Sequence, residues 1–246
     1  MFLPLRPEEG AHHFPKATFA LVGLCVLTFL VTRFGVFEET RELCLAYGEF
    51  NPVQWFTSAV MHADWWHLIG NMFFLFAFGI VVEGLAGTPI FLVLIGAATA
   101  MKGCVVQLLM LNFEWNPEQL EAWAALGFNN PPMPVALGAS GFIFAIMLAA
   151  MVWSPKNKII CLWIWSFMYL GTFRLPVTVF VGLYLVINVW DGLTEETVGF
   201  VVTTPWLHLI GGAAGGLLAW VFMVTGIVDT GGWHLFGPKA RRGDGW

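Results

Sequence analysis

Six long apolar segments follow one another along the chain and constrain its fold more than any other feature. They cover residues 17–36, 58–85, 89–111, 135–153, 176–191 and 205–228. A helix needs about 20 apolar residues to cross the hydrocarbon core of a bilayer. Moreover, 11% of the residues are charged, against about 25% in soluble domains. The sequence therefore predicts an all-α polytopic membrane protein with six transmembrane helices.

The same pattern predicts the domain organisation. We expect one transmembrane domain over residues 17–228, flanked by short segments at residues 1–16 and 229–246. The low charge content excludes an intrinsically disordered chain and a nucleic-acid surface built from Lys and Arg. The expected surrounding is therefore the lipid bilayer, with no nucleic-acid partner.

The basic residues predict the orientation in the membrane. Residues 159–173 are apolar but too few for a comfortable span, which leaves six or seven spans to choose from. With six spans, eight of the 11 Lys and Arg residues fall on one side: Arg6, Lys16, Lys156, Lys158, Arg174, Lys239, Arg241 and Arg242. Cytoplasmic loops are enriched in Lys and Arg. This bias favours six spans with residues 159–173 in the interface and both termini cytoplasmic, as in a protein of a bacterial cytoplasmic membrane.

A few polar side chains lie inside the predicted spans, where such groups are costly and often functional. The second segment contains His62, His67 and Asn71, the fourth Ser140 and the sixth His208. From the helical rise of about 1.5 Å per residue, Ser140 is expected about six residues inside its helix, at a depth comparable to His67 and His208. His67 and Asn71 share one helical face because they are four residues apart. His62 is expected to point elsewhere and to have a supporting role.

Small residues predict which helices touch. Two overlapping GxxxG pairs follow His208, formed by Gly211, Gly212, Gly215 and Gly216. The residues around Ser140 are also small, namely Gly138, Ala139, Gly141, Ala145 and Ala149. Faces of this kind let helices approach closely in membranes. We therefore expect the fourth and sixth segments to pack together and to bring Ser140 within hydrogen-bond reach of His208.

Ser140 and His208 have the chemistry of a nucleophile and a general base. A serine hydroxyl becomes reactive when an imidazole takes its proton. His67, Asn71 and the backbone N–H of Ser140 can donate hydrogen bonds to the oxyanion that forms on the attacked carbonyl. Since no Asp near the sixth segment offers a third member, we expect a dyad that transfers an acyl group to water inside the membrane.

These motifs resemble those of the rhomboid family of intramembrane serine proteases. The family's His, His and Asn pattern matches His62, His67 and Asn71, its GxSG motif matches Gly138, Ala139, Ser140 and Gly141, and its final-helix His with following glycines matches His208, Gly211 and Gly215. The resemblance spans the helical core and implies a rhomboid-like bundle of six helices. It also implies Ser140 as nucleophile, His208 as base, and His67 and Asn71 as oxyanion donors.

The resemblance implies further properties outside these motifs. Glu83 is expected to anchor the second helix, and Phe144 to stack on the catalytic histidine where the family often has a hydroxylated aromatic residue. The Trp–Arg pair that is common in the family's first outer loop is absent, because residues 51–55 read NPVQW. This departure leaves open how that loop is held. The implied substrates are transmembrane proteins, cleaved in or near their membrane-spanning segments.

Several alternatives remain open at this stage. Ser140 alone fits a small packing residue, and His67 and Asn71 fit hydrogen bonds that join helices. Lys102 in the third segment is an alternative base, because a Ser/Lys pair also activates serine; its other expected partners are Asp64 or loop carboxylates. A catalytically silent relative that binds transmembrane segments and a small transporter are the alternative functions. The chain has no HExxH motif and no pair of intramembrane Asp residues, so we expect neither a metal nor a cofactor.

Overall fold

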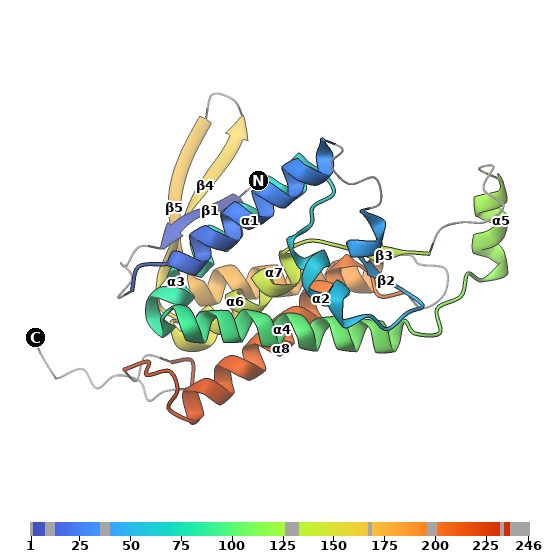
Figure 1. Ribbon diagram of the computed structural model, residues 1–246. Helices are drawn as coiled ribbons and strands as arrows, with labels where there is room; N and C mark the ends of the chain where they lie inside the picture. Colours follow the sequence, from blue (N-terminus) through green and yellow to red (C-terminus); the bar gives the residue numbers. More distant parts are fainter. Residues whose placement is uncertain are drawn as a thin grey trace, which may run out of the picture.

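The computed structural model in Figure 1 describes residues 2–7, 13–34, 40–125, 133–166, 169–195, 201–231 and 234–236. Five helices of this part are long and apolar enough to cross a membrane, which indicates a multi-pass membrane protein. They are α1 (Lys16–Arg33), α3 (Trp65–Ala86), α4 (Thr88–Leu109), α7 (Val177–Thr194) and α8 (Thr204–Val224). A sixth apolar helix, α6 (Ser140–Trp153), is shorter. These helices correspond in order to the six predicted segments.

The two ends of the helix bundle carry different additions (Figure 1). At the end where α6 begins lie the short helix α2 (Pro52–Val60), the 3-10 turn η1 (Arg41–Leu43) and α5 (Pro117–Ala125). We call this the serine end. At the opposite end α3 gives way to α4 through Gly87. We call this the Glu83 end, after the buried carboxylate found there.

The fold is mostly helical, as expected, but it is not all-α, because the described chain also contains two small antiparallel sheets. Residues 159–166 and 169–173 lie in the paired strands β4 (Lys158–Ser166) and β5 (Tyr169–Pro176), and β1 (Phe2–Pro7) pairs with β4. The β-branched and aromatic residues of this stretch, IICLWIW, favour strands. The sheet lies at the Glu83 end (Figure 1), so the apolar stretch does not form a seventh span.

The predicted helix over residues 58–85 is interrupted. α2 ends at Val60 and α3 begins at Trp65. The Asp64 carboxylate accepts hydrogen bonds from the backbone N–H groups of Trp66 (2.8 Å) and His67 (2.9 Å), as an N-cap residue does. These bonds, that of His67 foremost, hold the pKa of the Asp64 carboxyl below its usual range. Asp64 therefore starts α3 and separates it from α2.

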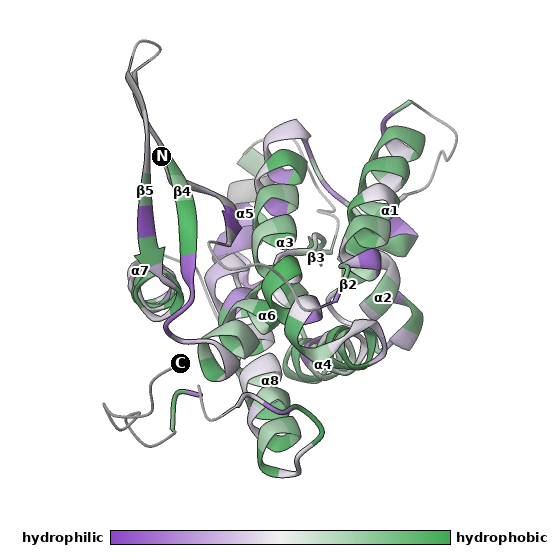
Figure 2. Ribbon diagram, turned by 90° about the vertical axis from the view of Figure 1, so that its left-hand side faces the viewer, coloured by the Kyte–Doolittle hydropathy of each residue, from purple (hydrophilic) through white to green (hydrophobic). Residues whose placement is uncertain are grey.

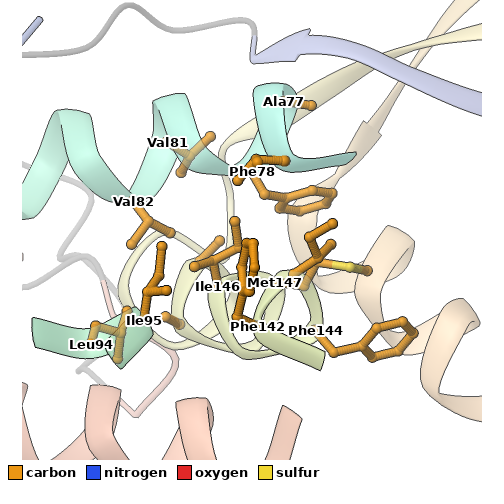
Figure 3. Close-up of a cluster of buried hydrophobic side chains, with 14 of the residues drawn as sticks. Ala77, Phe78, Val81, Val82, Leu94, Ile95, Phe142, Phe144, Ile146 and Met147 are labelled. Atoms are coloured by element: carbon orange, nitrogen blue, oxygen red, sulfur yellow. The ribbon is translucent and has the colours of Figure 1, made fainter. Parts of the chain in front are cut away.

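Helix α6 forms the centre of the bundle. Nearly all of its residues are buried, and Figure 3 shows Phe142 and Ile146 beside side chains of α3 and α4 such as Val82 and Ile95. The helices around it are coloured as largely hydrophobic in Figure 2. α7, for example, exposes Val186 and Leu193. Because α6 is buried among apolar helices, its position in the bundle is fixed, and so is that of its first residue.

Glu83 joins three helices at the Glu83 end. Its buried carboxylate accepts hydrogen bonds from the backbone N–H groups of Ala17 (2.8 Å) and Thr18 (2.7 Å), and from the hydroxyls of Thr18 (2.8 Å) and Thr88 (2.6 Å). The first N–H groups of a helix have no partner within it. Glu83 of α3 thus caps the start of α1 and holds the first residue of α4, the anchoring role that the resemblance implies.

Two buried amides hold the first loop at the serine end, where the chain lacks the Trp–Arg pair. Gln107 of α4 donates to Gln54 Oε1 (3.0 Å), and its own Oε1 accepts from the Trp55 indole (2.7 Å) and the Asn51 backbone N–H (2.8 Å). Gln54 Oε1 also accepts from the Ala46 N–H (2.9 Å). The loop is therefore fixed to α4 by neutral hydrogen bonds.

Candidate active site

Ser140 is the first residue of α6, so its predicted place six residues inside a helix starting at residue 135 is wrong. Residues before it are extended: β3 (Val135–Ala136) pairs with β2 (Leu45–Ala46). Gly138 then has a φ of +122°, which residues with a side chain rarely adopt, and its N–H donates to the Ser58 carbonyl (2.9 Å). The extended chain carries the serine into the bundle. Since a 14-residue helix is about 21 Å long, shorter than a hydrocarbon core of about 30 Å, its first residue can lie below the membrane surface.

Helices α6 and α8 meet backbone to backbone, as their small residues predict. A Cβ atom added to Gly211 would lie 2.2 Å from the Gly141 carbonyl oxygen, and one added to Gly215 would lie 2.3 Å from the Ala145 Cα. These contacts leave no space for any side chain at either glycine. They confirm the predicted close packing of the fourth and sixth segments.

The His208 ring, in the second turn of α8, is held between α6 and α7. It stacks on Phe144, with ring centroids 4.5 Å apart and planes 10° from parallel. Phe144 is four residues after Ser140 and therefore on the same face of α6. On α7, Asn188 Oδ1 lies 2.8 Å from His208 Nδ1. The stacking that the resemblance implies is present, together with a polar contact that the sequence did not predict.

His67 and Asn71 lie against the loop that leads to Ser140. A Cβ atom on Gly138 would lie 2.7 Å from His67 Nε2 and 3.7 Å from Asn71 Nδ2, so the glycine makes room for the His67 ring and lies next to Asn71. The Ala63 N–H approaches His67 Nδ1 at 3.4 Å, which leaves Nε2 as the ring's donor. Asn71 Nδ2 is buried and has no hydrogen-bond partner among the described residues. Two N–H donors thus face the serine loop.

His62 does not point elsewhere, as the spacing along one helix predicted. Its ring centroid is 5.0 Å from that of His67, because His62 precedes α3 in the turn between α2 and α3 and does not follow the helical spacing. Within the described part of the chain, both buried ring nitrogens of His62 are without a hydrogen-bond partner. Burial and, to a smaller extent, the neighbouring His67 lower the pKa of His62 to about 4.

Lys102 of α4 lies directly behind the start of α6. A Cβ atom on Gly141 would lie 2.7 Å from Lys102 Cδ and 3.3 Å from its Nζ, and the lysine is buried. The expected ion pair with Asp64 is wrong, because Asp64 caps α3. The stem of Lys102 fills the space that the absent side chain of Gly141 leaves.

The structure therefore places Ser140, His208, His67, Asn71, His62 and Lys102 at the serine end. Gly138 lies against His67, Gly141 against Lys102 and Phe144 against His208, while Gly211 and Gly215 lie against Gly141 and Ala145 of α6. Among the described residues Ser140 and His208 are not joined by a hydrogen bond, so their direct bond stays a prediction. Asn188 is the residue that the sequence reading missed. Its signal was a lone amide within an otherwise apolar span. Among the described residues, no group of three or more His, Cys, Asp or Glu side chains is arranged to hold a metal ion.

Comparison with known families agrees with this arrangement. The family model described as Rhomboid domain matches residues 49–225, almost three quarters of the chain. The match runs from before α2 to the end of α8 and so includes every residue of the site. A search of curated proteins finds no match. The family model, the six apolar helices and the serine end together show that the chain belongs to the rhomboid family, which includes serine proteases.

Proposed function

We propose that this protein is an intramembrane serine endopeptidase in which Ser140 is the nucleophile and His208 the general base. The observation that carries the proposal is the backbone contact between α6 and α8, combined with the stack of His208 on Phe144. This contact fixes an imidazole beside the face of α6 on which Ser140 lies. An imidazole beside a serine hydroxyl is the usual arrangement for activating the hydroxyl.

The proposed reaction proceeds in two acyl-transfer steps. His208 takes the proton of Ser140 Oγ while Oγ bonds to the carbonyl carbon of the substrate. The protonated imidazole then gives this proton to the leaving amine as the peptide C–N bond breaks. A water molecule releases the acyl group from Ser140 in the second step, again with His208 as the base.

The oxyanion is proposed to be bound by N–H donors at the serine end, of which Asn71 Nδ2 has no partner among the described residues. These are Asn71 Nδ2, the His67 Nε2–H and the backbone N–H groups at the start of α6, which has no side-chain cap. An uncapped helix N-terminus favours negative charge. Donors held in place before the reaction stabilise the developing charge without reorganising.

The proposed substrates are membrane proteins cleaved in or near a transmembrane segment. The site supports this choice because Ser140 follows an extended chain segment into a bundle of apolar helices. By family resemblance, small residues near the cleaved bond and easily unwound helices are preferred, and α7 with residues 191–204 forms the gate and cap. The excess of Lys and Arg at the Glu83 end supports cytoplasmic termini in a bacterial cytoplasmic membrane.

The proposal is tested with the full chain purified in detergent, a model single-pass substrate and a fluorophosphonate probe that labels active serines. Ser140→Ala and His208→Ala are expected to lose cleavage and labelling by more than 100-fold. Ser154→Ala, at the other end of α6, and His13→Ala, near Gly87, are the matched controls and should keep both. Persistent labelling of Ser140→Ala would refute the nucleophile.

The same assay separates His208 from the lysine alternative. Lys102→Met is expected to retain cleavage, because the unbranched side chain still fills the space beside Gly141. Loss of cleavage in Lys102→Met with retention in His208→Ala would make Lys102 the base.

A further inference from the structure

We infer that Asn188 is a positioning residue that orients His208 for proton transfer, so that the catalytic group has three members; this inference rests on the proposed function. Asn188 lies on α7, whose other side chains in this region face outward: Ile187, Val189 and Trp190 are exposed. Asn188 by contrast is buried. An amide within a membrane span is costly unless it has partners, and both ends of this one are hydrogen-bonded.

The hydrogen bonds of Asn188 determine which way its amide faces. Its Nδ2 donates to the Tyr184 carbonyl one turn earlier in α7 (2.8 Å), and its Oδ1 faces His208 Nδ1 (2.8 Å). The opposite orientation of the amide would place two oxygens, Oδ1 and the Tyr184 carbonyl, against each other. The backbone of α7 therefore selects the orientation in which Oδ1 is presented to His208.

This orientation fixes the proton on the histidine. An amide oxygen only accepts hydrogen bonds, so His208 Nδ1 carries the hydrogen and Nε2 keeps its lone pair. Nε2 is then the atom that can take the Ser140 proton. The Tyr184 carbonyl thus orients Asn188, and Asn188 in turn sets the His208 tautomer, the role that a carboxylate has in a Ser-His-Asp triad.

Asn188 and Phe144 restrain different motions of the ring. The stack on Phe144 restricts tilting out of the ring plane, whereas the hydrogen bond to Asn188 restricts rotation within it. During the reaction Nε2 gains and later loses the proton, while the Nδ1–H remains bonded to Oδ1. The expected contribution of Asn188 is thus to kcat, through the orientation and tautomer of His208.

The test compares Asn188→Leu and Asn188→Asp with the wild-type protein and with Ile187→Ala as the control on the adjacent, exposed position. Leu matches Asn in size but has no acceptor, and we expect kcat to fall 10- to 100-fold with KM within twofold of wild type. Asp retains an oxygen acceptor for His208 Nδ1 but loses the donor to the Tyr184 carbonyl, so its kcat is expected to lie between those of Asn188→Leu and the wild type. The midpoint of thermal unfolding in detergent, measured for each variant, reports on structural damage.

Each outcome is decisive. Unchanged kcat in Asn188→Leu, or a kcat in Asn188→Asp no higher than in Asn188→Leu, would overturn the positioning role. A loss that appears in KM alone, or only together with a lower unfolding midpoint, would also overturn it. Failure of the proposed function is distinguished by Ser140→Ala, because retained cleavage in that variant would refute the protease mechanism whatever Asn188 does.

Discussion

The two ends of the bundle both contain buried polar groups, but they treat these groups in opposite ways. At the Glu83 end, the Glu83 carboxylate accepts four hydrogen bonds from Ala17, Thr18 and Thr88. At the serine end, Asn71 Nδ2 and both ring nitrogens of His62 are buried without partners among the described residues. The difference separates a cluster that stabilises the fold from one that has donors left for a substrate.

The contrast also appears in how helices begin. Ala17 and Thr18, at the start of α1, give their N–H groups to Glu83, and α3 begins with N–H groups bonded to Asp64. α6 begins at Ser140 with no side-chain cap. The N–H groups of a capped helix start are already hydrogen-bonded within the fold. Those of an uncapped start remain free, and together with the helix dipole they favour negative charge. The start of α6 thus differs from the starts of α1 and α3, although α4, α7 and α8 also begin without a side-chain cap.

The largest expected effect is on the stability contributed by Glu83. In Glu83→Ala, the N–H groups of Ala17 and Thr18 lose their acceptor, and each buried orphan costs about 1–3 kcal/mol. We expect the free energy of unfolding in mixed detergent micelles to fall by about 4 kcal/mol, while cleavage per folded molecule is unchanged. Thr88→Val removes one hydrogen bond and should have a smaller effect in the same direction. Wild-type stability of Glu83→Ala would show that these hydrogen bonds do not stabilise the fold.

The next largest effect is expected at Asn71, where a substitution should lower catalysis and leave stability unchanged. Since Asn71 Nδ2 has no partner to lose among the described residues, Asn71→Ala should leave the free energy of unfolding within about 1 kcal/mol of wild type. The loss of one oxyanion donor should lower kcat/KM about 100-fold. Gln107→Leu is the matched control, because this amide is fully bonded and its loss should cost stability. Destabilisation of Asn71→Ala with normal kinetics would reassign Asn71 to helix packing.

The smallest effect is the pH dependence of stability that His62 produces. Its folded pKa of about 4 lies below the ordinary value of about 6.5, so the unfolded chain takes up the proton first as the pH falls. The contribution of His62 is thus present above pH 6.5 and is lost as the pH falls toward 4, by about 2 kcal/mol between pH 7 and pH 5. Unfolding measured at pH 7, 6 and 5 should show this extra loss in wild type and not in His62→Leu. Equal slopes in the two proteins would contradict it.

Much of the fold could be predicted because the membrane leaves few alternatives. The apolar segments give the helices and their order, and the glycines after His208 give the contact between α6 and α8. The errors occurred where local chemistry interrupts an apolar run. Hydropathy averages over Asp64, whose capping role begins α3, and over Gly138, whose positive φ precedes α6. Residues 159–173 were ambiguous because a short apolar run fits a strand as well as an interfacial segment.

The motif residues of the candidate site could be predicted from the sequence, but the contacts that Asn188 and His62 make with them could not. Ser140, His208, His67 and Asn71 stand out because polar groups are rare in these spans. Asn188 is equally rare, but its relevance depends on which face of α7 meets α8, and an apolar helix carries little information on its rotation. The position of His62 beside His67 likewise depends on the turn before α3, and no helical periodicity encodes that turn.

The pairing of β1 with β4 has a consequence for how the chain is made. Phe2 pairs with Trp163, so the partner of β1 is synthesised about 160 residues later, which takes about 8 to 30 seconds at 5–20 residues per second. During this time α1, α3, α4 and α6 can already enter the membrane, while β1 remains an unpaired edge open to other strands. Because β4 follows α6 in the sequence, the sheet can close only after α6 has been synthesised. The first strand is therefore paired late, when most of the bundle has left the ribosome.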